Sequence, residues 1–394
     1  MSQAIESEGE PAFVHTMFTR LRKRQWLNNG MVSSASLDPL YDRAPRIVIW
    51  EMTRACALAC RHCRADAQPR RDPLELGTAE AFTLIDQVAG FGKPLFVLTG
   101  GDPMMRDDLY ELIEYGCAHG LPVSISPSAT GRLTDEAIGR LAAAGVRRMA
   151  LSLDAPDAAE HDAFRGVRGS YARTLRAVRV AREHGMSVQI NTTLSQVNVH
   201  SIEEFGELLA GLDVAMWSVF FVLPIGRATA DLCLSAHETE GAFARLAAVA
   251  EGAGFDVKTT EAPHYRRYLM QHAASAPPRE RPAGAGAPPL RFAGIGDGRG
   301  FVFVSHQGDV YPSGFLPLRV GNVRERSLVE IYRDAPVMRR LRCPETFGGK
   351  CGLCEFHRIC GGSRARAYLT SGDPFASDPS CAYVSTAAGS LADV

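Results

Sequence analysis

Short apolar runs alternate with longer amphipathic segments between residues 46 and 225. The runs are rich in β-branched and aromatic residues, as buried strands are. They are Ile47–Trp50, Leu95–Leu98, Val123–Ile125, Met149–Leu153, Val188–Ile190 and Trp217–Val222. The segments between them, such as Ala79–Ala89 and Leu133–Ala144, repeat apolar residues at helical spacing. This alternation predicts an α/β fold on a parallel sheet of six strands, either a partial barrel or an open sheet. In both, the chemistry is expected at the carboxyl ends of the strands.

The pattern changes after residue 236. A helix, a strand at Phe255–Thr259 and a short helix are predicted next, followed by a flexible loop over 273–291 that is rich in Pro, Ala and Gly. Two short apolar runs, Phe301–Val304 and Val310–Tyr311, then flank a turn and predict a hairpin. Residues 343–385 hold many glycines and little apolar pattern, which is typical of a segment held together by metal.

These changes predict four parts. They are an N-terminal extension over 1–45, a core over 46–236, a helical connection over 237–300 and a C-terminal domain over 301–394. The extension contains a basic stretch, Phe18–Trp26, which we interpret as a solvated helix packed on the core rather than a nucleic-acid-binding arm.

Composition and charge narrow the classes of protein. With 46% hydrophobic and 22% charged residues among 394, the chain has the composition of an ordinary folded protein. Lys and Arg number 43 against 44 Asp and Glu, so the charge balance gives no case for nucleic-acid binding. The sequence has no apolar stretch of the roughly 20 residues that span a bilayer and no secretory signal at its polar, acidic start. We therefore expect a cytoplasmic protein that does not bind a membrane.

Seven of the ten cysteines fall into two tight groups. In a cytoplasmic protein such groups are metal ligands or catalytic thiols more often than disulfides. The first group, Cys56, Cys60 and Cys63, follows the first strand directly. A 4Fe–4S cluster takes one thiolate on each iron, so three cysteines would leave one iron open, as in a catalytic metal site. A redox dithiol of Cys60 and Cys63, or a zinc ion with His62 as fourth ligand, are the alternatives.

The C-x3-C-x2-C pattern in the first strand–helix loop resembles the radical S-adenosylmethionine (SAM) superfamily. Thr99-Gly100-Gly101-Asp102 after the second strand is similar to the glycine-rich segment of that superfamily. The resemblance implies a partial (β/α)6 barrel in which Cys56, Cys60 and Cys63 bind a 4Fe–4S cluster and the open iron binds SAM.

The resemblance also implies which residues contact SAM. The residues Thr99, Gly100, Gly101 and Asp102 are expected at its amino-acid end, where glycine lets the ligand approach the backbone. Asp102 can at the same time cap a helix that begins at Pro103. The contacts to ribose, carboxylate and adenine are expected at later strand ends, from Ser128, Ser152, Asp154, Asn191 and Gly226.

The second group comprises Cys351, Cys354, Cys360 and Cys381, enough for one fully ligated zinc or iron–sulfur centre. Its surroundings resemble the SPASM-type (twitch-like) C-terminal extension of radical SAM proteins. Ser313 and Arg364 stand where that extension usually has further cysteines, so we expect a single auxiliary 4Fe–4S cluster. Of the other three cysteines, Cys343 is predicted to be unpaired, with a role as a substitute ligand as the alternative, and Cys117 and Cys233 are predicted to act as small buried hydrophobes.

Within the superfamily, the sequence is most similar to the haem-pathway branch, which modifies tetrapyrrole side chains, and it shares a motif with peptide-maturing members. The resemblance implies that a reduced cluster cleaves SAM to a 5′-deoxyadenosyl radical, which takes hydrogen from the substrate. A tetrapyrrole, a peptide precursor or another small molecule is the expected substrate, and flavodoxin or ferredoxin the expected reductant. We identify no leader-peptide recognition segment at the N-terminus, which disfavours a peptide.

Two features leave alternatives open. The basic and aromatic stretch from His264 to Arg267 either meets a carboxylate-bearing substrate or forms a solvated helix surface. The chain as a whole could instead be a non-catalytic iron–sulfur electron-transfer protein or a zinc-stabilised binding module, although the Thr99–Pro103 loop disfavours the former.

Overall fold

The computed structural model describes residues 38–273 and 294–385. The basic stretch at 18–26, nearly all of the predicted loop at 273–291, and residues 386–394 lie outside this part of the chain. Within the described ranges, ten strands form one sheet in the order β10-β9-β8-β1-β2-β3-β4-β5-β6-β7. The strands are β1 (Ile47–Glu51), β2 (Leu95–Thr99), β3 (Val123–Ile125), β4 (Arg148–Ser152), β5 (Ser187–Leu194), β6 (Met216–Phe221), β7 (Asp256–Thr260), β8 (Phe301–Val304), β9 (Asp309–Tyr311) and β10 (Gly321–Asn322).

The six predicted strands are confirmed as β1 to β6, and they pair in parallel in sequence order. The sheet extends at both edges. On one side β7 pairs in parallel with β6, and on the other β8 pairs in parallel with β1 before β9 and β10 turn back antiparallel. The order ends at β7 and β10 without closing, so the sheet forms a partial barrel.

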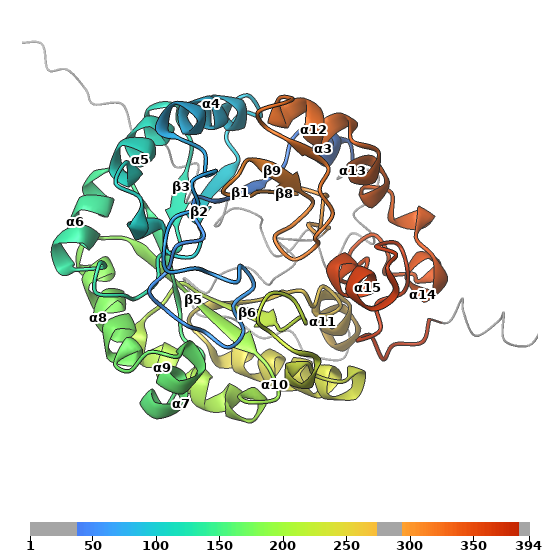
Figure 1. Ribbon diagram of the computed structural model, residues 1–394. Helices are drawn as coiled ribbons and strands as arrows, with labels where there is room; N and C mark the ends of the chain where they lie inside the picture. The colour runs from blue at the N-terminus through green and yellow to red at the C-terminus, as the bar shows by residue number, and fades with distance from the viewer. Residues whose placement is uncertain (1–37, 274–293, 386–394) are drawn as a thin grey trace, which may run out of the picture.

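Helices cover the outside of this sheet. The helices of the core are α3 (Asp38–Arg43), α4 (Thr78–Ala89), α5 (Leu109–Ala118), α6 (Asp135–Ala143), α7 (Ala158–Arg165), α8 (Ser170–Glu183), α9 (Ile202–Leu212), α10 (Ala236–Gly252) and α11 (Tyr265–Ala273). In Figure 1 the helices from α4 to α10 follow one another around the strands. Within the described residues, no helix is long and apolar enough to cross a membrane.

The strands alternate between the helix-facing core and the barrel interior, as period-two side-chain patterning requires. In β5, Val188, Ile190 and Leu194 are buried in the main hydrophobic cluster together with residues of α8 and α9. The intervening residues Asn191 and Thr193 therefore face the interior. This alternation decides which polar residues reach a site inside the barrel.

The C-terminal part wraps back onto the barrel. It contains α12 (Leu328–Asp334), α13 (Pro336–Leu341), α14 (Gly349–Leu353) and α15 (Arg364–Ser371). The first of these packs beside α4, where the backbone N–H of Leu328 donates to Gln87 Oε1 at 2.7 Å. Figure 1 shows α14 and α15 on the side of the barrel between α13 and α11. Because the predicted C-terminal domain begins with β8, it shares its first strand with the barrel sheet; its boundaries stay a prediction.

Candidate functional site

The first cysteine group lies in the loop that leaves β1. Cys56 and Cys60 are buried, and Cys63 is partly exposed. Two of the sulfurs accept backbone hydrogen bonds: Leu58 N–H lies 3.3 Å from Cys56 Sγ, and Ala67 N–H lies 3.4 Å from Cys63 Sγ. Burial raises the pKa of the Cys56 and Cys60 thiols. A bound cationic metal centre would hold them as thiolates, and N–H donors suit such sulfurs, so the loop fits an iron–sulfur cluster.

The glycine-rich loop after β2 pairs with the cysteine loop. Gly101 N–H donates to Thr53 O at 2.7 Å, and Asp102 N–H donates to Ala55 O at 2.7 Å. A Cβ on Gly101 would lie 2.5 Å from Ala55 O, and one on Gly100 would lie 2.4 Å from Thr53 O. The two glycines are therefore required by the close approach of the cysteine loop, whichever ligand binds there.

A third glycine meets the same loop from β6. Gly226 has a φ of +64°, and a Cβ at this position would lie 2.2 Å from Cys63 O. The next backbone N–H, that of Arg227, donates to Cys63 O at 3.0 Å. The cysteine loop is thus fixed from two strand ends, those of β2 and β6.

Asp102 begins a 3₁₀ helix at Pro103–Met105, which confirms the predicted cap. Its carboxylate accepts hydrogen bonds from Met104 N–H at 3.1 Å, Ser128 N–H at 3.3 Å and Thr130 Oγ1 at 3.0 Å. Burial raises the pKa of Asp102 to about 6. The side chain therefore joins the loops after β2 and β3, and it is fully buried.

A cavity lies against the cysteine loop inside the barrel. Its walls include the three cysteines and, of the predicted SAM-contact residues, Thr99, Gly100, Gly101, Ser128 and Ser152. The hydroxyl of Ser128 lies 3.5 Å from Cys56 Sγ and donates to Gly101 O at 2.9 Å. The structure thus gathers predicted residues from three strand ends around the cysteine loop; their contact with SAM stays a prediction.

The other predicted residues stand beside this cavity rather than on its wall. Asp154 is buried and accepts a hydrogen bond from Thr193 N–H at 2.8 Å, and Thr193 is the residue that lines the cavity. Asn191 is paired with Ser152 across the strands and accepts a hydrogen bond from Gln189 Nε2 at 2.7 Å. Four predicted residues are therefore not among the described residues that line the cavity, and they support its wall instead: Asp102, Asp154, Asn191 and Gly226.

The sequence interpretation missed three arginines that line the cavity. They are Arg64, Arg165 and Arg227. Two of them could have been found from the sequence, because each directly follows a predicted site residue: Arg64 follows Cys63, and Arg227 follows Gly226. The third, Arg165, ends α7 and carries no such signal.

Arg165 belongs to a buried polar group beside the cysteines. Its Nη1 lies 3.4 Å from Asp154 Oδ2, and Asp154 Oδ2 lies 3.8 Å from His62 Nε2. The imidazole of His62 stacks on Phe164 with 4.3 Å between ring centroids. Burial lowers the pKa of His62 to about 4, so the ring is neutral and packs beside the cysteine loop.

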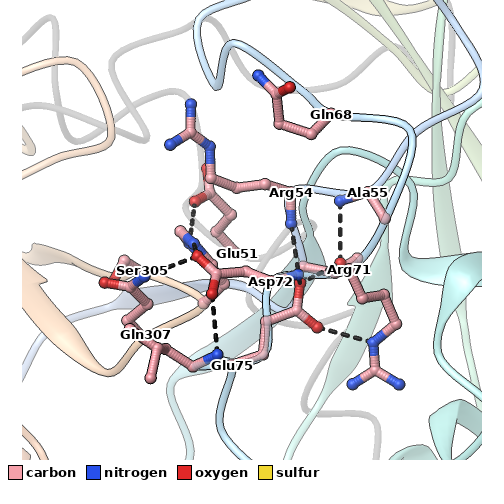
Figure 2. Close-up of polar contacts among 12 residues, drawn as sticks. Glu51, Arg54, Ala55, Gln68, Arg71, Asp72, Glu75, Ser305 and Gln307 are labelled. Carbon is pink, nitrogen blue, oxygen red and sulfur yellow. Dashed lines mark hydrogen bonds and ion pairs between the residues drawn. The ribbon is translucent and has the colours of Figure 1, made fainter.

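Arg64 is held by a network that reaches the β8–β9 turn. Its Nη2 pairs with Glu51 Oε2 at 2.5 Å, and His306 Nδ1 lies 3.0 Å from Glu51 Oε1. The other ring nitrogen of His306, Nε2, lies 3.3 Å from Asp72 Oδ2. Figure 2 shows Glu51, Asp72 and Gln307 meeting between the cysteine loop and this turn. The network therefore links the loop that follows Cys63 to the C-terminal part of the chain.

The second cysteine group lies on both sides of α15: Cys351 is in α14, Cys354 and Cys360 lie between α14 and α15, and Cys381 follows α15. Three sulfurs accept backbone hydrogen bonds of 3.3–3.4 Å: Cys351 from Asp378, Cys354 from Phe356, and Cys360 from Gly362. Burial raises the pKa of Cys360 against the hydrogen bond from Gly362 N–H, and the thiols of Cys381 and Cys351 act in the same direction as burial. In the described ranges, no three Cys, His, Asp or Glu side chains converge as the ligands of one metal ion do. A cubane cluster needs less convergence, because each thiolate binds its own iron.

The two positions at which the second group lacks further cysteines meet at one carboxylate. The backbone N–H of Arg364 donates to Asp297 Oδ2 at 3.1 Å, and the Ser313 hydroxyl is hydrogen-bonded to Asp297 as well. The Arg364 guanidinium donates to Ala376 O at 2.7 Å and contacts Cys351 Sγ at 3.4 Å. A hydrogen-bonded group therefore fills the region where the SPASM pattern has further cysteines.

Cys117 and Cys233 pack against hydrophobic clusters, but both are partly exposed rather than buried as predicted. A Cβ on Gly145 would lie 2.7 Å from Cys117 Sγ, so this thiol fills the space beside the glycine. Cys233 Sγ packs near the end of β6, 3.6 Å from Val222 O. The prediction for Cys343 stays a prediction.

The stretch from His264 to Arg267 is neither a solvated surface nor one continuous patch. His264 and Tyr265 are buried against Phe243, and Arg267 pairs with Glu240. Three of the four side chains also meet the C-terminal part. Arg266 Nη1 donates to Ile359 O at 3.1 Å, His264 Nδ1 lies 3.9 Å from Asp378 Oδ2, and the Arg267 guanidinium lies 5.1 Å from the centroid of the Tyr383 ring. The solvated-helix interpretation is therefore wrong, because three of the four side chains pack into the protein.

Comparison with known proteins identifies the family. Residues 50–209 match the model of the Radical SAM superfamily. The chain is 42% identical over 348 residues to the AdoMet-dependent heme synthase of Nitratidesulfovibrio vulgaris, covering 87% of this chain and 94% of that protein. It is 30% identical over 344 residues to the mycofactocin maturase MftC of Mycobacterium tuberculosis, covering 86% and 83%. The crystal structure of Streptococcus suis SuiB bound to precursor peptide SuiA matches with a TM-score of 0.67 and 18% identity, covering 89% of this chain and 79% of that chain.

The chain therefore belongs to the radical SAM superfamily, and it is an enzyme. It is similar to haem-pathway synthases and to a peptide maturase, and it shares the fold of a peptide-bound member. The cysteine loop fits the 4Fe–4S cluster of this superfamily, which, when bound and reduced, supplies the electron that cleaves SAM to a hydrogen-abstracting 5′-deoxyadenosyl radical. The residues of this chain fix the loop, exclude water from its buried sulfurs and surround the cavity beside it. A non-catalytic electron-transfer protein and a zinc-stabilised module are set aside by this assignment.

Proposed function

We propose that this enzyme uses SAM to modify the side chains of a carboxylate-bearing tetrapyrrole in the synthesis of haem. The 42% identity to a heme synthase, over 94% of that protein, supports this assignment. The cavity beside the cysteine loop supports it as well, because its chemistry suits a flat, apolar ring with a charged edge.

Part of the cavity wall is aromatic and aliphatic. Phe220 and Phe315 both line the cavity, with 6.1 Å between their ring centroids, and Leu223 and Ile225 join them. Flat apolar side chains of this kind pack well against an extended ring system. Three arginines line the same cavity, and Arg227, whose Nε and Nη2 have no hydrogen-bond partner among the described residues, suits a carboxylate at the edge of such a ring. This pairing of aromatic and guanidinium groups in one cavity is the observation that carries the proposal.

We also propose that Cys351, Cys354, Cys360 and Cys381 bind a single auxiliary 4Fe–4S cluster. The backbone donors to three of these sulfurs and the buried Arg364 beside Cys351 support this ligand set. A cluster with all four irons ligated serves electron transfer and shapes the domain rather than binding substrate. A flavodoxin or a ferredoxin is the proposed source of electrons.

The test is an anaerobic incubation of the iron-reconstituted enzyme with SAM, dithionite and Fe-coproporphyrin III. This is the tetrapyrrole after which another relative, the Fe-coproporphyrin III synthase of Methanosarcina barkeri, is named. The expected result is 5′-deoxyadenosine together with haem, both measured by liquid chromatography and mass spectrometry. Formation of 5′-deoxyadenosine with unchanged tetrapyrrole would contradict the proposed substrate. No 5′-deoxyadenosine from a brown, four- to eight-iron preparation would contradict catalysis by the first cluster.

A ribosomal peptide precursor is the second candidate substrate. The 30% identity to a mycofactocin maturase over 83% of that protein favours it. The same preparation decides between the two, because only a peptide maturase would couple 5′-deoxyadenosine formation to a mass change in a peptide encoded beside the gene.

A further inference from the structure

The three arginines that line the cavity differ in how their guanidinium groups are engaged. Arg64 pairs with Glu51 and donates to Gly314 O at 3.0 Å, and its guanidinium lies 4.8 Å from the centroid of the Phe303 ring. Arg165 lies 3.4 Å from the Asp154 carboxylate. Both cations are therefore neutralised by a buried carboxylate of the protein.

Arg227 is different. Its Nε and Nη2 are both buried and find no hydrogen-bond partner in residues 38–273 and 294–385. Its Nη1 has one long contact, 3.4 Å from Ala67 O. Buried cationic donors without a partner are costly, so their retention indicates that something outside the described protein atoms accepts these hydrogen bonds.

The position of Arg227 is fixed although its donors are unsatisfied. Its backbone N–H donates to Cys63 O at 3.0 Å, and Gly226 before it makes a contact with the same carbonyl that only glycine allows. The Nε and Nη2 of an arginine lie on one edge of the guanidinium, the edge that binds a carboxylate through two parallel hydrogen bonds. A carboxylate is therefore the ligand group that this side chain is suited to bind.

The segment that carries Arg227 is matched to one kind of substrate. Phe220, Leu223 and Ile225 precede it along the chain, and all of them line the same cavity. One continuous segment from the end of β6 thus offers apolar surface and then a guanidinium. An amphipathic molecule with a flat apolar body and a carboxylate at its rim satisfies both parts.

We propose that Arg227 is the residue that binds a substrate carboxylate, through Nε and Nη2, and so orients the substrate beside the cysteine loop. The inference rests on the proposed function, since it takes a carboxylate of the tetrapyrrole as the ligand. SAM also carries a carboxylate, so the experiment must separate the two sources.

The experiment titrates iron-free coproporphyrin III, followed by its fluorescence, into reconstituted holoenzyme. The variants are Arg227→Gln and Arg227→Lys, and Arg147→Gln at an exposed position before β4 is the matched control. Arg227→Gln is expected to weaken porphyrin binding roughly tenfold to a hundredfold, the loss of a charge-assisted hydrogen-bond pair, and Arg227→Lys less. The methyl ester of the porphyrin is expected to bind the wild type and Arg227→Gln equally. The affinity for SAM is measured in parallel, and a loss of porphyrin affinity larger than any loss of SAM affinity assigns Arg227 to the substrate carboxylate.

Iron content and absorbance equal to the wild type establish that each variant keeps its cysteine loop. Unchanged porphyrin affinity in Arg227→Gln would overturn the inference alone. Weakened SAM affinity with unchanged porphyrin affinity would assign Arg227 to the SAM carboxylate and overturn the inference too. A wild type that makes 5′-deoxyadenosine but binds no porphyrin would contradict the proposed function, and the inference with it.

Discussion

Each buried thiol of the first group has surroundings that disfavour a free thiolate and favour a metal-bound one. Burial raises the pKa of Cys60, and the nearby charge of Asp154 acts in the same direction against the guanidinium of Arg165. Without iron, Cys56 and Cys60 would therefore be protonated at neutral pH. Iron replaces those protons, so loading of the cluster should depend on every one of the three sulfurs.

Cys60→Ala is expected to lose the first cluster and at least a hundredfold of SAM cleavage, because two thiolates cannot hold a cubane with one open iron. The measurements are iron content per chain and 5′-deoxyadenosine under dithionite. Cys233→Ala is the matched control, since Cys233 belongs to neither cysteine group. Retained SAM cleavage in Cys60→Ala would contradict the assignment of the ligand.

His306 is expected to make stability depend on pH. Burial lowers its pKa, but the hydrogen bonds and charges of Glu51 and Asp72 outweigh burial and leave the pKa raised above 6.5. Because the folded pKa is higher than the unfolded one, the contribution of His306 to stability is complete below about pH 6.5 and is lost as pH rises through the folded pKa. His306→Gln should therefore lower the free energy of unfolding by about 1–3 kcal/mol at pH 6 and by less at pH 9.

Thermal melting of the reconstituted enzyme from pH 6 to pH 9 measures this difference. The charge of Arg54 also acts on His306, and it lowers the pKa of the imidazole. An equal loss of melting temperature at all pH values would show that the imidazole acts only through packing.

At the scale of elements, hydrophobic periodicity predicted β1 to β6 closely, because each strand is buried against helices on one face. The residues at the strand ends were predicted to form one site, but the segments of the chain that they contact in the fold were not predicted. Gly100, Gly101 and Gly226 are needed by the backbone of the cysteine loop, and no spacing in the sequence reports a contact between segments so far apart. Arg165 was missed for the same reason, since its partner Asp154 is joined to it by the fold alone.

Gly226→Ala is the sharpest test at this scale. The new methyl group would meet Cys63 O at 2.2 Å, and a φ of +64° is strained for alanine. We expect the variant to lose the first cluster while the second group keeps its iron, about half of the wild-type content. Gly211→Ala in α9, where a Cβ meets nothing within 4 Å, is the control and should be more stable by about 1 kcal/mol. Full iron content in Gly226→Ala would show that the loop tolerates displacement.

At the scale of the whole molecule, the C-terminal part is bound to both edges of the barrel. β8 pairs with β1 at one edge. At the other, Ser363 Oγ donates to Glu261 Oε2 at 2.5 Å just after β7, and Arg366 donates to Glu261 O at 2.7 Å. The sequence predicted a separate extension, because the segment around the second cysteine group has its own composition. Pairing between strands some 250 residues apart leaves no periodic signal, so the shared sheet could not be predicted.

Because the C-terminal part is attached at the edges of the barrel, we expect the two cysteine groups to have separable roles. Cys354→Ala should remove the auxiliary cluster and about half of the iron, yet leave the loop after β1 intact, because that loop is fixed by the ends of β2 and β6. SAM cleavage without substrate should then stay within about threefold of the wild type, whereas haem formation should fall at least tenfold, since the product step lacks its electron-transfer partner. Anaerobic assays of 5′-deoxyadenosine and haem in parallel measure the split, with Cys343→Ala as control. If both activities fell together, the auxiliary group would support the fold of the first site, and a separate role in turnover would be excluded.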